Sequence, residues 1–181
     1  MKILIVSQYY DPEQFQINEI APELVKRGHQ VTVLTGLPNY PGGEIYAGYE
    51  KGRRSEDING VHVIRVNDLP RKNGALHLFF NYFSFAAAGR KRAKKLGAFD
   101  IVLGYQLSPV SSLEPAILYA GRNRVPLLAY CLDLWPESAK AHTTVKLLYH
   151  AISVYSKHVY QKCDHIGMAD LSGYFFGFLL Q

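Results

Sequence analysis

Two carboxylates and the only tryptophan of the chain lie together in one short segment. Asp133 and Glu137 flank Trp135, directly after residues 126–131, which have the apolar composition of a buried strand. Ligands of open α/β sheets bind beyond the carboxyl ends of the strands. The two carboxylates are therefore candidates to accept hydrogen bonds from the hydroxyl groups of a sugar. The alternative, of equal weight, is that one of them caps the next turn while the tryptophan packs in the interior.

Four further side chains are candidates for binding hydroxyl groups. The loop of residues 36–43 is rich in Gly and Pro and exceeds the roughly two to six residues of an ordinary strand–helix connection, which indicates a functional loop. It carries Asn39 and Tyr40. Tyr105 and Ser108 follow a later strand at its carboxyl end. Nothing in these residue types and positions identifies a general base, so no catalytic residue is assigned.

A basic and aromatic segment at residues 76–96 has a different chemistry. Aromatic side chains are frequent in residues 78–85, and five cations follow, namely Arg90, Lys91, Arg92, Lys94 and Lys95. A helix of this kind can lie in a membrane interface, with its rings among the headgroups and its cations on anionic lipid. The alternative is a helix that covers the sheet and whose solvated cations are favoured near its negative C-terminal end.

The chain lacks the motifs of several well-defined enzyme classes. The first strand–helix turn, residues 7–14, has no G-x-G-x-x-G, and neither GxxxxGK[ST] nor G-x-S-x-G occurs in the sequence. These absences disfavour a dinucleotide dehydrogenase, a P-loop NTPase and an α/β-hydrolase. We expect Asp11 to cap a helix with Pro12 at its first position, a role compatible with a phosphate at the N–H groups of that helix.

Metal and nucleic-acid sites are not expected. The seven histidines are scattered without HExxH or a His/carboxylate cluster, and Cys131 and Cys163 lie far apart in apolar runs. We therefore expect no metal, no disulfide and two buried thiols. No helix-turn-helix, RNP or OB pattern is present, so nucleic acid is not expected as a partner.

Apolar runs alternate with amphipathic stretches along the whole chain. Residues 3–6 and 31–35 are typical strands of a parallel sheet, and the stretch between them has helical spacing and ends at Gly28. Pro22 indicates either a kink in this helix or a shorter helix that starts there. The Asn-Gly pair at 59–60 predicts a hairpin. The other expected strands are residues 53–58, 61–66, 99–104, 126–131 and a last one at 163–169, and the other expected helices are 76–96, 109–122 with Ser108 as its cap, and 142–161.

This alternation predicts one doubly wound α/β domain. A chain of 181 residues fits a single domain of roughly 100–200 residues, and a composition of 48% hydrophobic and 19% charged residues excludes disorder and a coiled coil. The net charge of +5 is mildly basic and selects no partner.

No stretch reaches the about 18 apolar residues of a membrane span, and the first apolar run is too short for a signal peptide. We expect a cytoplasmic protein with at most a peripheral contact to the inner face of the cell membrane.

Several blocks together resemble GT-B glycosyltransferases of the family 4 type (group 1), and within them the bacterial surface-polysaccharide, fucosamine-transferase-like subgroup. The blocks are RGHQVTVLT at 27–35, LPNYP at 37–41 with IYAGY at 45–49, NGVHVIRV at 59–66 and DLWPES at 133–138. The resemblance covers nearly the whole chain, from the first residue to about residue 170.

The resemblance implies a Rossmann-like, doubly wound and mostly parallel sheet that forms the N-terminal half of a GT-B enzyme. In that family the N-terminal half shapes the acceptor side of a cleft, and the C-terminal half binds the nucleotide-sugar donor. Transfer is typically retaining and metal-free, and basic side chains and helix N-termini stabilise the leaving diphosphate. Acceptors in this subgroup are often polyprenyl-diphosphate-linked sugars, in capsule, O-antigen or exopolysaccharide (lipopolysaccharide-type) synthesis. The six candidate site residues are then expected to bind the acceptor.

The sequence ends at Gln181, where an enzyme of this family would continue into its donor-binding half. We therefore expect residues 1–181 to be an acceptor-side domain without the C-terminal donor-binding domain, inactive alone and dependent on a separate donor-binding domain or chain. The first strand–helix loop also lacks the paired glycines of many members. One alternative is a non-catalytic module, derived from such an enzyme, that binds a glycan or a membrane-bound partner. The other is an unrelated flavodoxin-like binder of small molecules.

Overall fold

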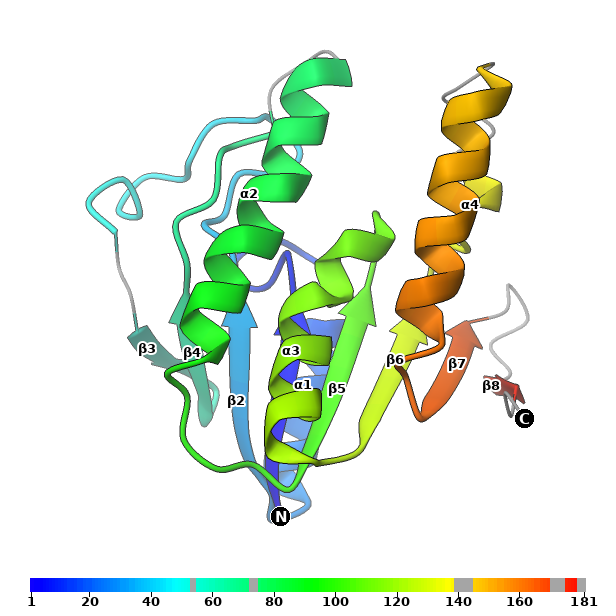
Figure 1. The fold of residues 1–181 in the computed structure, drawn as a ribbon. Coiled ribbons are helices and arrows are strands. Elements are labelled where there is room, and N and C mark those ends of the chain that lie inside the picture. Colours follow the sequence, from blue (N-terminus) through cyan, green and yellow to red (C-terminus); the bar gives the residue numbers. More distant parts are fainter. Residues whose placement is uncertain (53–54, 72–74, 139–144, 170–174, 179–181) are drawn as a thin grey trace.

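The computed structural model describes residues 1–52, 55–71, 75–138, 145–169 and 175–178 (Figure 1). Within these ranges, eight strands form one sheet in the spatial order β3-β4-β2-β1-β5-β6-β7-β8. The strands are β1 (Lys2–Ser7), β2 (Gln30–Thr35), β3 (Ser55–Ile58), β4 (Val61–Arg65), β5 (Ile101–Gln106), β6 (Leu127–Cys131), β7 (His165–Ala169) and β8 (Phe175–Phe178). Pairs are parallel except β3 with β4 and β7 with β8, so six strands end at one edge of the sheet.

Helices cover both faces of this sheet (Figure 1). Helix α1 (Ile17–Lys26) lies on one face, and α2 (Ala75–Ala93), α3 (Glu114–Asn123) and α4 (Lys146–Tyr160) lie on the other. Neighbouring residues of β1 therefore enter different cores: Ile5 packs with Ile17 of α1, and Leu4 packs in the cluster that contains Phe85 of α2. Burial on both faces explains the continuous apolar run of this strand.

Several expected elements are confirmed. Asn59 and Gly60 join β3 and β4 as an antiparallel hairpin and have φ angles of 51° and 80°, which explains the choice of these residues for the turn. Gly28 follows α1 with a φ of 85°. Cys131 and Cys163 are buried free thiols. The predicted residues 53–54 and 142–144 lie outside the described residues.

The predicted start of the first helix is wrong. Residues 11–13 form a turn, and α1 begins at Ile17 with Gln16 as its N-cap, so Asp11 caps no helix. The Asp11 carbonyl instead accepts a hydrogen bond from Arg65, a contact across 54 positions that local pattern cannot anticipate. The helix also continues through Pro22, which excludes the shorter helix starting there.

Two further expectations are corrected. Ser108 caps no helix, because a short 3-10 turn at Val110–Leu113 precedes α3, whose first turn carries a proline, and neither element has a side-chain cap. The strand at 163–169 is not the last one, since β8 pairs with it in antiparallel orientation. The predicted α/β class is unaffected by these changes. Of the helices that the structure describes, none has the length and apolar character needed to cross a bilayer.

Candidate functional site

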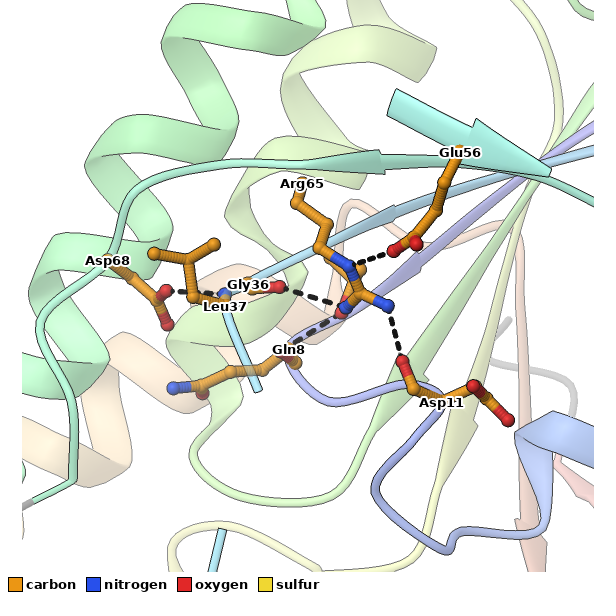
Figure 2. A network of polar contacts seen from close by, with 8 residues as sticks. Gln8, Asp11, Gly36, Leu37, Glu56, Arg65 and Asp68 are labelled. Atoms are coloured by element: carbon orange, nitrogen blue, oxygen red, sulfur yellow. Dashed lines mark hydrogen bonds and ion pairs between the residues drawn. The ribbon is translucent and has the colours of Figure 1, made fainter. Parts of the chain in front are cut away.

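Arg65, the last residue of β4, joins three segments at the carboxyl edge of the sheet (Figure 2). Its Nε donates to Oε1 of Glu56 at 2.5 Å, and its other guanidinium N–H groups donate to the backbone carbonyls of Gly36 and Asp11. The side chain of Arg65 is 0% exposed. A buried cation with matched acceptors thus ties the loops after β1 and β2 to the β3–β4 hairpin.

A buried carboxylate holds the loop after β2. Glu13 is 2% exposed, and its Oε1 accepts the backbone N–H of Asn39 at 2.8 Å and that of Tyr40 at 2.6 Å. Burial raises the pKa of Glu13 to about 7, although these backbone hydrogen bonds and the charge of Arg65 act in the opposite direction. Part of the loop predicted to be functional is therefore pinned to the loop that precedes α1.

Asn39 and Asp68 fix the same loop from its other side. The Asn39 Nδ2 donates to the Leu37 carbonyl at 2.7 Å, and its Oδ1 accepts the backbone N–H of Arg71 at 2.8 Å. Oδ1 of Asp68 accepts the backbone N–H of Leu37 at 2.8 Å (Figure 2). Burial raises the pKa of Asp68 to about 7, against the lowering effect of that N–H. A Cβ on Gly36 would lie 2.5 Å from Oδ2 of Asp68, so any larger residue at this position would displace the carboxylate that holds the loop.

Helix α2 is docked to these loops through one buried amide. Gln8 donates from Nε2 to Oδ1 of Asn81 at 2.9 Å, and the Asn81 Nδ2 donates to the Leu69 carbonyl. The backbone N–H of Leu69 in turn donates to Oγ of Ser84 at 2.8 Å. The loops after β1 and β4 are thereby held in register with the middle of α2.

Three aromatic rings line the loop after β2. The ring centroids of Tyr9, Phe15 and Tyr40 lie 5.4 to 5.6 Å apart from one another. The guanidinium of Arg71 lies over the Tyr40 ring, 5.4 Å from its centroid. Tyr9 is buried, and burial raises the pKa of its phenol, whereas Tyr40 and Arg71 are half-buried. Tyr40 therefore combines a packed ring with access to solvent.

Half-buried polar groups from three other segments act on Tyr82 of α2. Burial raises the pKa of the Tyr82 phenol; the charge of Arg71 and a hydrogen bond with Ser108 oppose the rise, and the charge of Asp133 adds to it. These groups are close enough to act on one phenol, and each is half-buried. Tyr40 adjoins this group through the contact of its ring with Arg71. We call Tyr40, Arg71, Tyr82, Ser108 and Asp133 the carboxyl-edge site. It offers hydroxyl donors, one carboxylate acceptor and one guanidinium, a set suited to a hydroxylated or phosphorylated ligand.

The backbone around Asp133 is held by Gln106, at the end of β5. The Gln106 Nε2 donates to the Asp133 carbonyl at 2.8 Å, and its Oε1 accepts the hydroxyl of Tyr160 at 3.1 Å. Trp135 is half-buried and packs against the core, which agrees with the packing role considered for it. Glu137 is exposed, and no hydrogen bond of its carboxylate falls within the described residues.

The structure thus separates the six residues predicted to bind an acceptor. Tyr40, Ser108 and Asp133 belong to the carboxyl-edge site, and Glu137 is exposed one turn after Asp133. Asn39 is fully buried, with both side-chain polar atoms bonded within the protein. Tyr105 is also buried and stacks on Tyr130 at a centroid distance of 5.6 Å. Neither Asn39 nor Tyr105 offers an exposed polar atom, so both side chains have a structural role in this conformation. Acceptor binding by the six residues stays a prediction.

The five cations of α2 and its end do not form one group. Arg90 pairs with Glu114 of α3, which also accepts the Tyr155 hydroxyl at 2.9 Å. Lys91, Arg92 and Lys95 line a pocket beside β4, and Lys94 is exposed. Their predicted contact with a membrane stays a prediction. Within the part of the chain that the structure describes, no three His, Cys, Asp or Glu side chains are placed to hold a metal ion.

Two residues of the carboxyl-edge site escape the sequence patterns. Arg71 stands in irregular chain after β4, and Tyr82 stands in an aromatic stretch whose pattern indicates packing or membrane contact. The one available signal is that Tyr82 is the only residue of residues 78–85 with both a ring and a hydroxyl. Tyr82 enters the site because of the position of α2 against the loops, and sequence spacing does not define that position.

Comparison with known proteins gives one family and a shared fold. Residues 14–166 match a family model described as "Glycosyl transferase 4-like domain". A solved structure described as trehalose-6-phosphate from E. coli bound with UDP-2-fluoro glucose is 12% identical with a TM-score of 0.57, and the match covers 96% of this chain and 41% of that one. The alpha,alpha-trehalose 6-phosphate synthase of Burkholderia multivorans is 9% identical with a TM-score of 0.49, covering 97% and 45%. No curated protein sequence matches significantly. The chain spans less than half of either solved protein.

Proposed function

We propose, from the premise that this chain belongs to the family of glycosyl transferase 4-like domains, that it shapes the acceptor side of a sugar-transfer site. The chain is a glycosyltransferase-like domain of GT-B type, and its mostly parallel α/β sheet is the Rossmann-like fold expected from the sequence. The proposed reaction moves a sugar from a nucleotide-sugar donor to a lipid-linked or glycan acceptor in the synthesis of a surface polysaccharide. We further propose that configuration is retained and that no metal takes part.

The carboxyl-edge site is the observation that carries this proposal. Tyr82, Ser108 and Asp133 present a phenol, a hydroxyl and a carboxylate at one place, and each is half-buried. Such groups donate to and accept from sugar hydroxyls, and their partial burial strengthens each hydrogen bond relative to bulk water. Arg71 adds a guanidinium that can bind a phosphate oxygen of a diphosphate-linked acceptor.

The framework behind the site supports the same role. Arg65, Glu13 and Asn81 join loops after several strands through buried polar contacts. A binding site is precise when its side chains are held by packing and by further hydrogen bonds. Tyr40 and Asp133 therefore stand on loops whose backbone is fixed before a ligand arrives.

Exposed apolar side chains near this edge fit an acceptor with a lipid part. The N-terminal parts of α2 and α4 both extend beyond the carboxyl edge of the sheet (Figure 1). Phe79, Phe80 and Phe83 of α2 are 53% to 62% exposed, and Leu147 of α4 is 80% exposed. Aromatic and aliphatic groups at such tips partition into the interface of a bilayer. We propose that these apolar side chains contact the membrane or the lipid of the acceptor.

We propose that the donor is bound by a different domain from this one, since the match to the solved E. coli protein covers only 41% of that protein. The 181-residue chain is then expected to bind UDP and GDP weakly or not at all in calorimetry. It is expected to bind farnesyl-diphosphate-linked N-acetylglucosamine, presented in detergent micelles, in a saturable way that Asp133→Asn weakens. Tight, saturable binding of UDP or GDP would overturn the acceptor-side assignment.

The second candidate, a non-catalytic module, is favoured by the exposed Phe79, Phe80 and Phe83, which a membrane-bound partner could also cover. Mixing the chain with donor-binding halves of related enzymes separates the two functions. Restored transfer from a nucleotide sugar supports the enzyme, whereas saturable acceptor binding with no turnover in any mixture supports the module.

A further inference from the structure

A basic pocket lies between the C-terminal part of α2 and the β3–β4 edge of the sheet. Its volume is about 620 Å³, and its lining includes Ser55, Asn67, Ala88, Lys91, Arg92 and Lys95. A volume of this size falls in the range of about 300–1,000 Å³ that is typical of small-molecule sites. The pocket is therefore larger than a single phosphate ion requires.

The charge of the pocket is uncompensated within the described residues. Arg65 also reaches it, but its guanidinium is neutralised by Glu56 at 2.5 Å. Lys91, Arg92 and Lys95 have no ion pair among the residues that the structure describes, and no acidic side chain lines the pocket there. Within the part of the chain that the structure describes, the pocket thus holds three positive charges that no acidic side chain pairs with.

The spacing of these cations adds a second argument. Lys91 and Arg92 stand in the last turn of α2, and Lys95 lies in the turn that follows, where its backbone N–H donates to the Arg92 carbonyl at 2.9 Å. All three cations line the same pocket, and like charges gathered in one place repel one another. The nearby acid Glu114 pairs with Arg90, which faces α3 instead. A bound anion is the group that would relieve the repulsion.

The remaining lining residues complete a site for an anion with an organic part. The Ser55 hydroxyl lies 3.1 Å from Nε2 of His62 at the rim, and the side chain of Asn67 is exposed toward solvent. Both can donate hydrogen bonds to oxygen. Val66 and Ala88 supply apolar surface next to the charges.

We propose that this pocket binds a phosphate-bearing ligand, either a soluble phosphorylated molecule or the headgroup of an anionic lipid. Lys91, Arg92 and Lys95 bind the phosphate oxygens, because charge-assisted hydrogen bonds from ammonium and guanidinium groups to phosphate are the strongest contacts this chain can offer there. Val66 and Ala88 contact the organic part of the ligand.

Pyrophosphate and vesicles are the two probes of the test, applied to the 181-residue chain. Calorimetry measures pyrophosphate binding, and flotation compares phosphatidylglycerol vesicles with phosphatidylcholine vesicles. The matched variants are Lys95→Gln, which removes a lining charge, and Lys94→Gln, which removes an equal charge from the next, exposed position. Ala88→Met fills the pocket and leaves every charge in place.

Lys95→Gln is expected to weaken binding of at least one probe about tenfold, the loss of one charge-assisted contact, while Lys94→Gln changes it less than about twofold. Ala88→Met is expected to weaken the same probe. Binding of pyrophosphate assigns a soluble phosphorylated ligand, and binding of phosphatidylglycerol vesicles alone assigns a lipid headgroup. Equal effects of Lys94→Gln and Lys95→Gln, or no binding of either probe, overturn the proposal. Binding is read without sugar transfer, so this outcome is independent of the proposed function.

Discussion

The carboxylate of Glu13 accepts the backbone N–H of Tyr40 at 2.6 Å, and both residues lie in loops at the carboxyl edge of the sheet. Glu13 is 2% exposed, so this contact is made out of reach of bulk water. An acidic side chain that is both buried and bonded to backbone N–H groups is subject to opposite influences on its pKa. Burial dominates here and raises the pKa of Glu13 to about 7.

The first prediction concerns stability against pH. The pKa of Glu13 rises from 4.5 to about 7 and that of Asp68 from 3.8 to about 7, so between about pH 4 and 7 the folded chain keeps protons that the unfolded chain has lost. These two groups therefore make the free energy of unfolding fall as pH rises through this window. Glu13→Gln keeps an oxygen for both N–H groups and removes the charge. We therefore compare the free energy of unfolding of Glu13→Gln with that of the unmodified chain. This difference should favour Glu13→Gln by up to about 3 kcal/mol more at pH 8 than at pH 4.

Urea unfolding at a series of pH values measures this difference. Glu44→Gln, in an exposed part of the loop after β2, serves as the control and should leave the pH profile unchanged. A Glu13→Gln profile parallel to that of the unmodified chain contradicts the assignment of a raised pKa to Glu13.

The second prediction concerns the buried cation. Arg65→Gln removes the guanidinium that pairs with Glu56 and takes donors away from the carbonyls of Asp11 and Gly36. Breaking a buried pair on one side costs about 3–5 kcal/mol, which urea unfolding would detect as a lower midpoint. Arg27→Gln breaks the exposed pair of Arg27 with Glu23 and should cost less than about 1 kcal/mol. Equal costs for the two variants would refute the structural role of Arg65.

The order of strands and helices could be predicted because its signals are local. Apolar runs such as residues 3–6, the turn pair Asn59 and Gly60, and Gly28 after a helix each depend on a few adjacent residues. The predictions were wrong where contacts between residues far apart in the sequence determine where a helix begins. Asp11 caps no helix because α1 begins only at Ile17, and the Asp11 carbonyl is instead bonded to Arg65, 54 positions away. Ser108 caps none because a 3-10 turn intervenes before α3.

The candidate site follows the same division. Tyr40, Ser108 and Asp133 were predicted from their positions after strands, and the common edge of a parallel sheet brings such positions together. Arg71 and Tyr82 were missed, because their proximity depends on how α2 docks through Asn81. Asn39 was predicted to bind a ligand although its amide is buried, because residue type alone does not show whether a side chain is exposed.

The third prediction compares two glycines on neighbouring helices. A Cβ on Gly89 of α2 would lie 2.5 Å from Cγ of Pro115 on α3, whereas a Cβ on the exposed Gly121 would meet nothing within 4 Å. Gly89→Ala should therefore destabilise the fold by about 1–3 kcal/mol through overpacking. Gly121→Ala should stabilise it by about 0.5–1 kcal/mol, because alanine has the higher helix propensity. Thermal unfolding of both variants measures the two signs, and a gain in Tm for Gly89→Ala contradicts close contact of α2 and α3.

The last prediction concerns the carboxyl-edge site. Tyr82→Phe keeps the ring and removes the hydroxyl beside Ser108, and Asp133→Asn keeps the shape and removes the charge that acts on Tyr82. A hydrogen bond to a charged group is worth about 1.5–3 kcal/mol, so Asp133→Asn should weaken acceptor binding by about tenfold or more, and Tyr82→Phe by somewhat less.

The measurement is calorimetry with farnesyl-diphosphate-linked N-acetylglucosamine in micelles, and transfer after a donor-binding half is supplied. Asp57→Asn, on the exposed hairpin, is the matched control and should bind as the unmodified chain does. Unchanged binding and transfer for Asp133→Asn together with Glu137→Gln would remove this segment from the site, because the acceptor would then contact neither carboxylate.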